Sequence, residues 1–441
     1  MWVNARWILP LVLAFGQTVA GESWSDPQEI GIHPAPNQVS ADLSSDGAAV
    51  VVYNRMEASE DNKLQMWVEA NSRSKDGKWS TPQRLSPKTP VDWNIWIYPQ
   101  AAIDSSGFSY AIWKYFDGEQ QGLKSAFLPY SSWYWWQSDD WGGFPCPLAD
   151  SIGDYQIAAY KNQCAIALWS AERNGGYSIE GAFFDPQSSR PTMWSALPSI
   201  SIASKCKTSS LNAKVDSEGT IWIIWSNFSD DLQRDKVCIA SLAREASSWS
   251  EPFTLSIGKE VWEPKLSIDP KGNLLARWQK IVGDRKLAFE GFKKQADSDV
   301  WKKTQFPDLD NKILDCGEVT FDQKGNALLI WDQSDDQKCS LILSKDSYKW
   351  KKYNVISKEC IGAWGSAIDK KGNRLFAFNN IKENLLKVST LPANNWKQWS
   401  KPVTITSSNY LIDYVGLAGE KALIVYEDDG NVKAVSGQPF K

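Results

Sequence analysis

Histidine is nearly absent from this chain of 441 residues, and its scarcity removes several catalytic mechanisms. The one histidine, His33, lies in a proline-containing stretch near the N-terminus. Ser-His or Cys-His chemistry therefore has one candidate base and no recognisable partner. His-Glu-x-x-His, P-loop and dinucleotide-binding patterns are also missing. We expect no cofactor and no metal, and the sequence singles out no catalytic residue.

The chain also lacks an excess of positive charge, since its formal net charge is -4 at pH 7. A protein that binds nucleic acid needs a strong positive field to attract the phosphates. We therefore expect no nucleic acid among its partners.

Long apolar runs are missing after the first twenty residues. Residues 1–20 carry one basic residue, Arg6, then an apolar run from Trp7 to Phe15 and the small residues Thr18-Val19-Ala20. This order is typical of a secretory signal peptide. The run is too short for a comfortable membrane span of about 20 residues, although an uncleaved anchor is the alternative. We expect residues 21–441 to form a soluble protein that is secreted or periplasmic.

Cysteines number seven, and none lies in a Cys-x-x-Cys pair, so zinc-ribbon and thioredoxin-type sites have no support. In an exported protein they favour disulfides. Cys206 precedes one predicted inner strand, and Cys238 begins the third strand of the same repeat. Cys316 and Cys339 occupy comparable places two repeats later. We predict these two pairs, with buried thiols as the alternative.

Tryptophan, by contrast, is abundant, with 25 residues. Eight Trp-led segments are each followed, about thirty residues later, by a short apolar strand that ends in an aromatic. The leading residues are Trp24, Trp79, Trp141, Trp194, Trp249, Trp301, Trp350 and Trp399. The closing aromatics are Tyr53, Trp113, Trp169, Trp225, Trp278, Trp331, Phe378 and Tyr426. A repeat of roughly 50 residues that carries only strand-like segments is the sign of a β-propeller.

The fifth repeat shows the unit most clearly. Residues 263–268 alternate as a strand, Asp269-Pro270-Lys271-Gly272 forms a tight turn, and residues 273–278 form the second strand. Residues 286–291 form the third strand, and Trp301 opens the fourth. Four antiparallel strands make a propeller blade. The aspartates that recur at the turn are explained by turn chemistry without a bound ion.

We therefore predict an all-β fold, a single propeller of eight four-stranded blades over residues 21–441. Seven blades is the alternative if the irregular third repeat is an insertion. The segment at Trp24 resembles an outer strand, and the chain ends soon after the third strand of the eighth repeat. We expect the N-terminal strand to join the last blade, which would remove exposed sheet edges.

The tandem pattern of Trp-Ser-x-Pro, Asp-x-x-Gly-Asn and a strand that closes in Trp resembles exported bacterial propeller-like proteins. Gly272-Asn273, Gly325-Asn326 and Gly372-Asn373 carry the closest match. The resemblance covers nearly all of the mature chain, but it implies only the fold and export, because that group is largely without assigned function. The chain looks less like a sialidase, whose Asp-box places Trp closer to Gly.

Loops at one end of the propeller collect acidic and aromatic residues. We predict that this acidic, aromatic face binds a ligand through Trp93, Trp96, Trp262, Trp364, Asp230, Asp231, Asp335 and Asp336. Tryptophans beside carboxylates suit sugars, because the ring covers the apolar face of a pyranose while polar groups hold its hydroxyls. The alternative is that these tryptophans only cap the inner strands. The segment Trp133-Tyr134-Trp135-Trp136 is a further aromatic concentration, either exposed or buried.

The opposite face collects lysines, and we expect it to contact an anionic envelope surface or simply to keep the turns soluble. These residues are Lys75, Lys78, Lys271, Lys293, Lys294, Lys324, Lys345, Lys370 and Lys371.

Three functions stay open at this point. The first is a monomeric, non-enzymatic protein that binds a glycan or protein partner. The second is a glycoside hydrolase, because carboxylate pairs suffice for that chemistry and four acids fall at or near inner strands. These acids are Glu263, Asp315, Glu318 and Asp413. The third is the scaffold of a cell-envelope complex.

Overall fold

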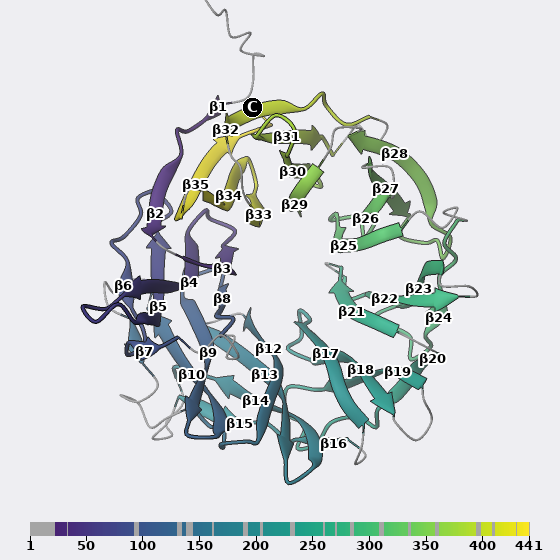
Figure 1. Ribbon diagram of the computed structural model, residues 1–441. Helices are drawn as coiled ribbons and strands as arrows, with labels where there is room; N and C mark the ends of the chain where they lie inside the picture. The colour runs from purple at the N-terminus through teal and green to yellow at the C-terminus, as the bar shows by residue number, and fades with distance from the viewer. Residues whose placement is uncertain are drawn as a thin grey trace, which may run out of the picture.

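The computed structural model is an all-β ring of eight sheets, seven of which are built on four consecutive strands (Figure 1). It describes residues 23–32, 34–91, 97–129, 135–137, 144–160, 163–187, 193–202, 206–229, 234–258, 261–269, 271–282, 286–307, 313–333, 337–357, 361–393, 398–407, 411–428 and 430–440. Over these residues there is no helix, and hence none long and apolar enough to cross a membrane. The prediction of an eight-bladed β-propeller is confirmed, and the seven-bladed alternative is wrong.

Each blade begins with the strand nearest the axis of the ring and ends at the outer rim (Figure 1). The inner strands are β3 (Pro34–Leu43), β8 (Gln100–Ile103), β12 (Ser151–Tyr160), β17 (Cys206–Val215), β21 (Val261–Ile268), β25 (Ile313–Phe321), β29 (Ile361–Ile368) and β33 (Ile412–Ala418). The second strands are β4 (Ala49–Ala58), β9 (Ser109–Asp117), β13 (Cys164–Arg173), β18 (Ile221–Ser229), β22 (Leu274–Val282), β26 (Ala327–Gln333), β30 (Arg374–Asn380) and β34 (Lys421–Asp428).

The third strands are β5 (Leu64–Arg73), β10 (Gln120–Leu128), β14 (Gly176–Phe184), β19 (Arg234–Leu242), β23 (Lys286–Lys294), β27 (Gln337–Leu343), β31 (Leu385–Leu391) and β35 (Asn431–Gln438). The outer strands of the first seven blades are β6 (Gln83–Arg84), β11 (Trp136–Gln137), β15 (Trp194–Ala196), β20 (Phe253–Gly258), β24 (Lys302–Lys303), β28 (Lys351–Ser357) and β32 (Val403–Ser407). Two short strands, β7 (Thr89–Pro90) and β16 (Ile200–Ile202), pair with β5 and β14.

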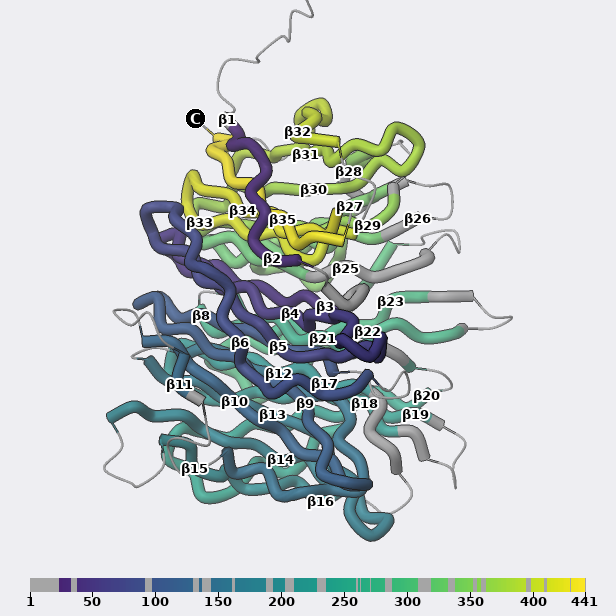
Figure 2. The backbone as a smooth tube through the Cα atoms, turned by 60° about the vertical axis from the view of Figure 1, so that its left-hand side comes forward, coloured from purple at the N-terminus to yellow at the C-terminus, as the bar shows by residue number. Residues whose placement is uncertain are grey.

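The eighth blade takes its outer strand from the other end of the chain. Strand β1 (Ser23–Trp24) pairs antiparallel with the end of β35, and β2 (Gln28–Ile32) pairs with its beginning. Figure 2 shows these N-terminal strands running along the yellow strands of the C-terminus. The outward edge of β35 is therefore covered by backbone hydrogen bonds rather than exposed.

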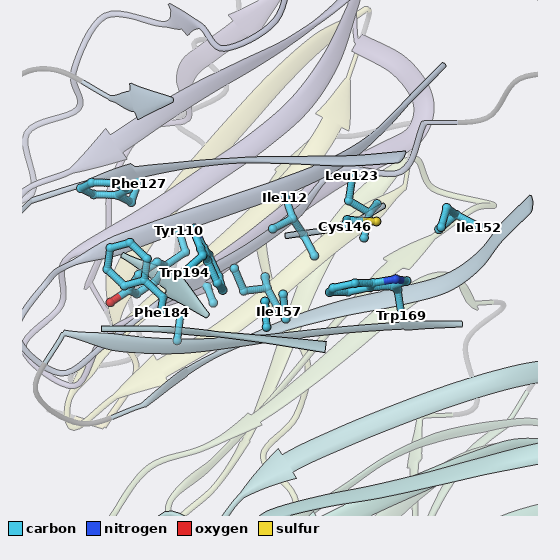
Figure 3. Packing of buried hydrophobic residues seen from close by; sticks show 14 of the residues in the cluster. Tyr110, Ile112, Leu123, Phe127, Cys146, Ile152, Ile157, Trp169, Phe184 and Trp194 are labelled. Atoms are coloured by element: carbon cyan, nitrogen blue, oxygen red, sulfur yellow. The ribbon is translucent and has the colours of Figure 1, made fainter. Parts of the chain in front are cut away.

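The core lies between neighbouring blades, and the closing aromatics fill it. All eight are buried. Between the second and third blades, Trp169 packs in one cluster with the rings of Phe127, Phe184 and Trp194 (Figure 3). The centroids of Phe127 and Phe184 are 4.8 Å apart, and those of Phe184 and Trp194 are 5.1 Å apart. Burial of each large apolar side chain contributes roughly 1.5–3 kcal/mol. The interpretation of the closing aromatics as core residues is confirmed.

The aromatic concentration near residue 135 also packs inward. Trp135 is buried, and half-buried Trp136 lies 5.7 Å from the ring of Phe127. Trp133 and Tyr134 are outside the described residues. The described part of this segment therefore supports the alternative of burial.

The Asp-x-x-Gly turns hold their shape through their own side chains. Asp269 Oδ1 accepts hydrogen bonds from the backbone N–H of Lys271 and of Asn273, at 2.8 and 2.9 Å. Gly272 has a φ of +82°, which L side chains rarely adopt. Asn273 donates to Asp269 Oδ2 and accepts from Ala296 N, so it ties this turn to the one between the third and fourth strands. This confirms that the recurrent aspartates serve turn chemistry.

Glu290 makes a buried polar network in the fifth blade. It lies opposite the closing aromatic Trp278, whose indole N–H donates to Glu290 Oε2 at 3.2 Å. Ser256 and Lys280 reach the same carboxylate at 2.7 and 2.9 Å, and Lys303 pairs with it as well. Burial opposes the ionisation of Glu290, but the hydrogen bonds from Lys303, Lys280 and Ser256 outweigh it and lower its pKa to about 2.

The two predicted disulfides are wrong. Cys316 and Cys339 both lie opposite Trp331, on the two sides of β26. Two strand spacings separate their Cα atoms by about 10 Å, whereas a disulfide spans at most about 7 Å. Cys206 and Cys238 are likewise separated by β18. Cys238 and Cys339 are buried thiols, as the alternative stated.

Candidate functional site

Polar side chains of the inner strands line the axis of the ring. Each stands thirteen residues ahead of its closing aromatic, as Ser40 does ahead of Tyr53. Among the side chains that the structure describes, the set comprises Ser40, Gln100, Gln156, Asn212, Lys265 and Asp413. The hairpin register accounts for this offset, because Ala101 pairs with Ala111 two residues before Trp113. Residues at this constant spacing therefore lie at the same height along the axis of the ring.

Three of these side chains bind the neighbouring blade. Ser40 Oγ accepts from Ala101 N at 3.0 Å, and Gln156 Oε1 accepts from Ala213 N at 2.7 Å. Asn212 Oδ1 accepts from the N–H of the next inner strand, at Leu266, at 2.8 Å. An inner strand has no strand partner on its axial side, so its backbone donors need acceptors from elsewhere. These polar residues supply them, and their first role is to join the blades.

A cavity of about 610 Å³ opens at the axis between β29, β33, β3, β8 and β12. Its chemically distinctive lining residues are Trp364, Asp413, Gln100, Gln156 and Ser366. In Figure 1 these strands occupy adjoining positions around the left and upper part of the central opening. An aromatic ring, a carboxyl group, amides and a hydroxyl therefore meet in one concavity, which is the usual composition of a small-molecule site.

Trp364 joins the blade core to this cavity. The ring is half-buried, and its centroid lies 5.7 Å from that of Phe376. The Lys338 ammonium group lies 5.2 Å from the Trp364 ring centroid, within the range of a cation–π interaction. The ring is therefore held in place by contacts from the sixth and seventh blades while it also lines the cavity.

Asp413 is the one acidic residue in the described lining of this cavity. Within the described residues its Oδ2 atom is inaccessible to solvent and has no hydrogen-bond partner. Burial, together with the neighbouring Glu427, raises the pKa of Asp413 to about 8. At neutral pH this side chain therefore carries a proton and can donate a hydrogen bond into the cavity.

The predicted site residues are only partly described. Trp93, Trp96, Asp230, Asp231, Asp335 and Asp336 lie outside the described residues. Trp262 is in β21 opposite Gln279, but its side chain is not described. Trp364 is the member of the set that the structure places in a cavity.

The four acids considered for hydrolysis do not form a described pair. Glu263 is exposed at an irregularity of β21, with a φ of +47°. Asp315 and Glu318 are in β25, with side chains outside the described set. Of the two acids whose side chains are described, Asp413 lines the Trp364 cavity and Glu263 does not.

Two of the nine lysines assigned to the opposite face are buried. Lys293 donates to the carbonyl of Lys345, and the Lys294 ammonium group lies 5.2 Å from the Trp222 ring centroid. The apolar stems of both lysines pack on the blade, while their ammonium groups contact a backbone carbonyl and an indole ring. The expectation that Lys293 and Lys294 contribute to an exposed basic face is wrong.

Sequence reasoning missed Gln100, Gln156 and Ser366. The signal for the two glutamines was their fixed offset from the closing aromatic, a position that varies in residue type from blade to blade. Ser366 lies next to Gly365 in β29, where a Cβ on the glycine would approach Val415 within 2.6 Å. That close approach brings β29 and β33 together, and no local sequence pattern predicts it.

No protein family matches the sequence, and no curated protein resembles it. Solved structures with a similar fold include a polysaccharide lyase, the PL25 ulvan lyase, at 10% identity and a TM-score of 0.48, over 92% of this chain and 93% of that one. The Dos1 propeller matches at 11% identity and a TM-score of 0.47, over 93% and 95%. The β-propeller domain of the trilobed protease from Pyrococcus furiosus matches at 8% identity and a TM-score of 0.45, over 77% and 94%. At such identities these similarities concern the fold alone.

Proposed function

We propose that this propeller is an exported glycan-binding protein whose ligand occupies the axial cavity at Trp364 and Asp413. The observation that carries the proposal is the convergence of a half-buried indole, an unpartnered carboxyl group and two amides in a concavity of about 610 Å³. The indole offers a flat apolar surface for one face of a sugar ring. Gln100 and Gln156 offer amide groups for its hydroxyls.

Asp413 gives this cavity a specific hydrogen-bond donor. With its pKa raised to about 8 by burial and by Glu427, the carboxyl group is protonated at neutral pH and can donate to a sugar oxygen. A ligand hydroxyl would also give the Asp413 Oδ2 atom the partner that the described chain does not supply. Binding would therefore relieve a cost already present in the unliganded protein.

The test is binding to a glycan array followed by titration of the best neutral glycan. Trp364→Ala should weaken binding by at least tenfold, because stacking on the indole is lost. Trp222→Ala is the matched control, since Trp222 is also half-buried and also lies 5.2 Å from a lysine ammonium group, but away from the cavity. Equal binding by the wild type and Trp364→Ala, or equal losses in both variants, would contradict the proposal.

A glycoside hydrolase is the second candidate, because a carboxyl group with a raised pKa suits a general acid. Its partner carboxylate is not supplied by the described lining of the cavity. Release of reducing sugar from the bound glycan by the wild type, lost in Asp413→Asn, would favour the hydrolase over a binding protein.

A further inference from the structure

A second cavity, of about 310 Å³, lies between the inner strands β17, β21 and β25. Its polar lining comprises Asn212, Lys214, Lys265, Ser267 and Thr320. These residues belong to the C-terminal halves of their strands. In Figure 1, β21 and β25 lie across the ring from β3 and β8, which line the Trp364 cavity.

The two lysines have no close anionic partner among the residues that the structure describes. Neither the Lys214 nor the Lys265 ammonium group forms an ion pair within 4.0 Å or a hydrogen bond with this part of the chain. The acids they influence are Asp42 and Asp154, at longer range. Two positive charges therefore line one concavity without direct neutralisation.

Those two acids are already engaged by the backbone. Asp42 accepts from Ile103 N at 3.0 Å and from Leu43 N at 2.8 Å, while Asp154 accepts from Leu211 N at 3.2 Å. Burial raises the pKa of both carboxyl groups, although these bonds and the lysines oppose the rise. Their oxygens are therefore already used by backbone N–H donors rather than by the two lysines.

We propose that the Lys214–Lys265 cavity binds a small oxyanion, the carboxylate, sulfate or phosphate group of a ligand in the axial opening. Lysine acts on such groups as a point charge, and the Thr320 hydroxyl adds a neutral donor. A cleft lined by one sign of charge with low-dielectric walls concentrates its field on the ligand. The volume is about ten times that of a water molecule, so a charged group with part of its carrier fits.

The two cavities adjoin at one hydrogen bond. Gln156 lines the Trp364 cavity and Asn212 lines the lysine cavity, and the Asn212 amide donates to Gln156 Oε1 at 3.4 Å. If a glycan occupies the Trp364 cavity as proposed above, a charged group of that glycan can reach the lysine cavity, and the ligand is an acidic sugar. This extension rests on the proposed function. The oxyanion site itself depends on the lysine cavity alone.

The experiment is calorimetric titration of the full chain with sodium sulfate and with sodium glucuronate, at constant ionic strength kept with sodium chloride. Both anions should bind the wild type. The double variant Lys214→Gln with Lys265→Gln should bind them at least tenfold more weakly, because both charges are removed. Lys265→Arg should keep most of the affinity, since it retains the charge.

Lys236→Gln with Lys401→Gln is the matched control, because it makes the same change of net charge on lysines outside both cavities. Absence of sulfate binding to the wild type, or equal affinity in the wild type and the Lys214–Lys265 double variant, would overturn the proposal. An equal loss in the control would do the same, since it would reduce the effect to net charge. Sulfate has no sugar ring to stack on Trp364, so failure of sulfate binding is distinguishable from failure of neutral-glycan binding.

Discussion

Glu290 in the fifth blade and Asp413 at the axial cavity are both acidic side chains withdrawn from solvent, yet their surroundings shift their pKa values in opposite directions. Hydrogen bonds from Lys303, Lys280 and Ser256 outweigh burial and lower the pKa of Glu290 to about 2. Burial and the negative charge of Glu427 raise that of Asp413 to about 8. The difference lies in the hydrogen-bond donors. The fifth blade supplies three of them to Glu290, whereas the described chain supplies none to Asp413 Oδ2.

This contrast separates structural polar groups from candidates for function. A buried polar group whose partners all come from the chain stabilises the fold, because removing one member leaves the others unsatisfied. A group that lines a cavity and lacks a partner is a place where a ligand can supply one. The three predictions below test this distinction on the two regions, beginning with the largest change in the free energy of unfolding.

Trp278→Ala should destabilise the protein by about 3–5 kcal/mol, since it removes a fully buried indole and leaves a cavity between blades. Urea unfolding at pH 7 measures the change. Trp364→Ala, at a half-buried ring that lines the axial opening, should cost less than half as much. Equal losses for the two variants would break the distinction between blade interior and axial cavity.

Glu290→Gln should cost about 2–3 kcal/mol at pH 7, because the charge-assisted bonds to Lys280 and Lys303 are lost. The pKa of Glu290 is lower in the folded state than its ordinary value of 4.5. Its contribution is therefore present above pH 4.5 and is lost as the pH falls toward about 2. The wild type and the variant should converge over that interval in urea unfolding curves, and a difference independent of pH would contradict the assignment.

The propeller was predictable because its determinants are local and repeated. Asp269, Gly272 and Asn273 specify one turn through contacts within five residues, and Trp278 recurs at a fixed distance from that turn. Such a pattern is visible in one repeat, and its Asp-x-x-Gly turn recurs in four others. The blade interior followed from the same logic, since a large aromatic at a constant position must pack against the next blade.

The site was harder to predict because its members come from different blades. Trp364 was predicted as one of the tryptophans of the acidic, aromatic face, and Asp413 only as one of four acids at or near inner strands. Their meeting depends on the order of β29 and β33 around the ring and on the close approach at Gly365. The lysine cavity was missed for the same reason, since Lys214 and Lys265 occupy positions whose residue type varies between blades. A polar side chain in an inner strand does not reveal whether it joins two blades or lines a cavity.

Asp413→Asn should change stability in the direction opposite to Glu290→Gln. The pKa of Asp413 is higher in the folded state than its ordinary value of 3.8, so wild-type stability is full below pH 3.8 and declines as the pH rises toward about 8. The asparagine cannot ionise and avoids this decline. We expect the variant to be more stable than the wild type by about 2 kcal/mol at pH 8, less than the full shift implies because Asp413 is partly exposed.

Urea unfolding between pH 4 and pH 8 measures this difference, which should vanish at the acid end. Glycan titration at pH 7 tests whether Asp413 contributes to ligand binding. If Asp413 donates to the ligand, Asp413→Asn should weaken binding severalfold while it stabilises the protein. Loss of binding together with a gain in stability is expected for a group that serves function rather than folding. A variant that loses stability at pH 8 would place Asp413 with Glu290 among the structural carboxylates. A variant that gains stability without any change in binding would contradict the role of Asp413 as a donor to the ligand.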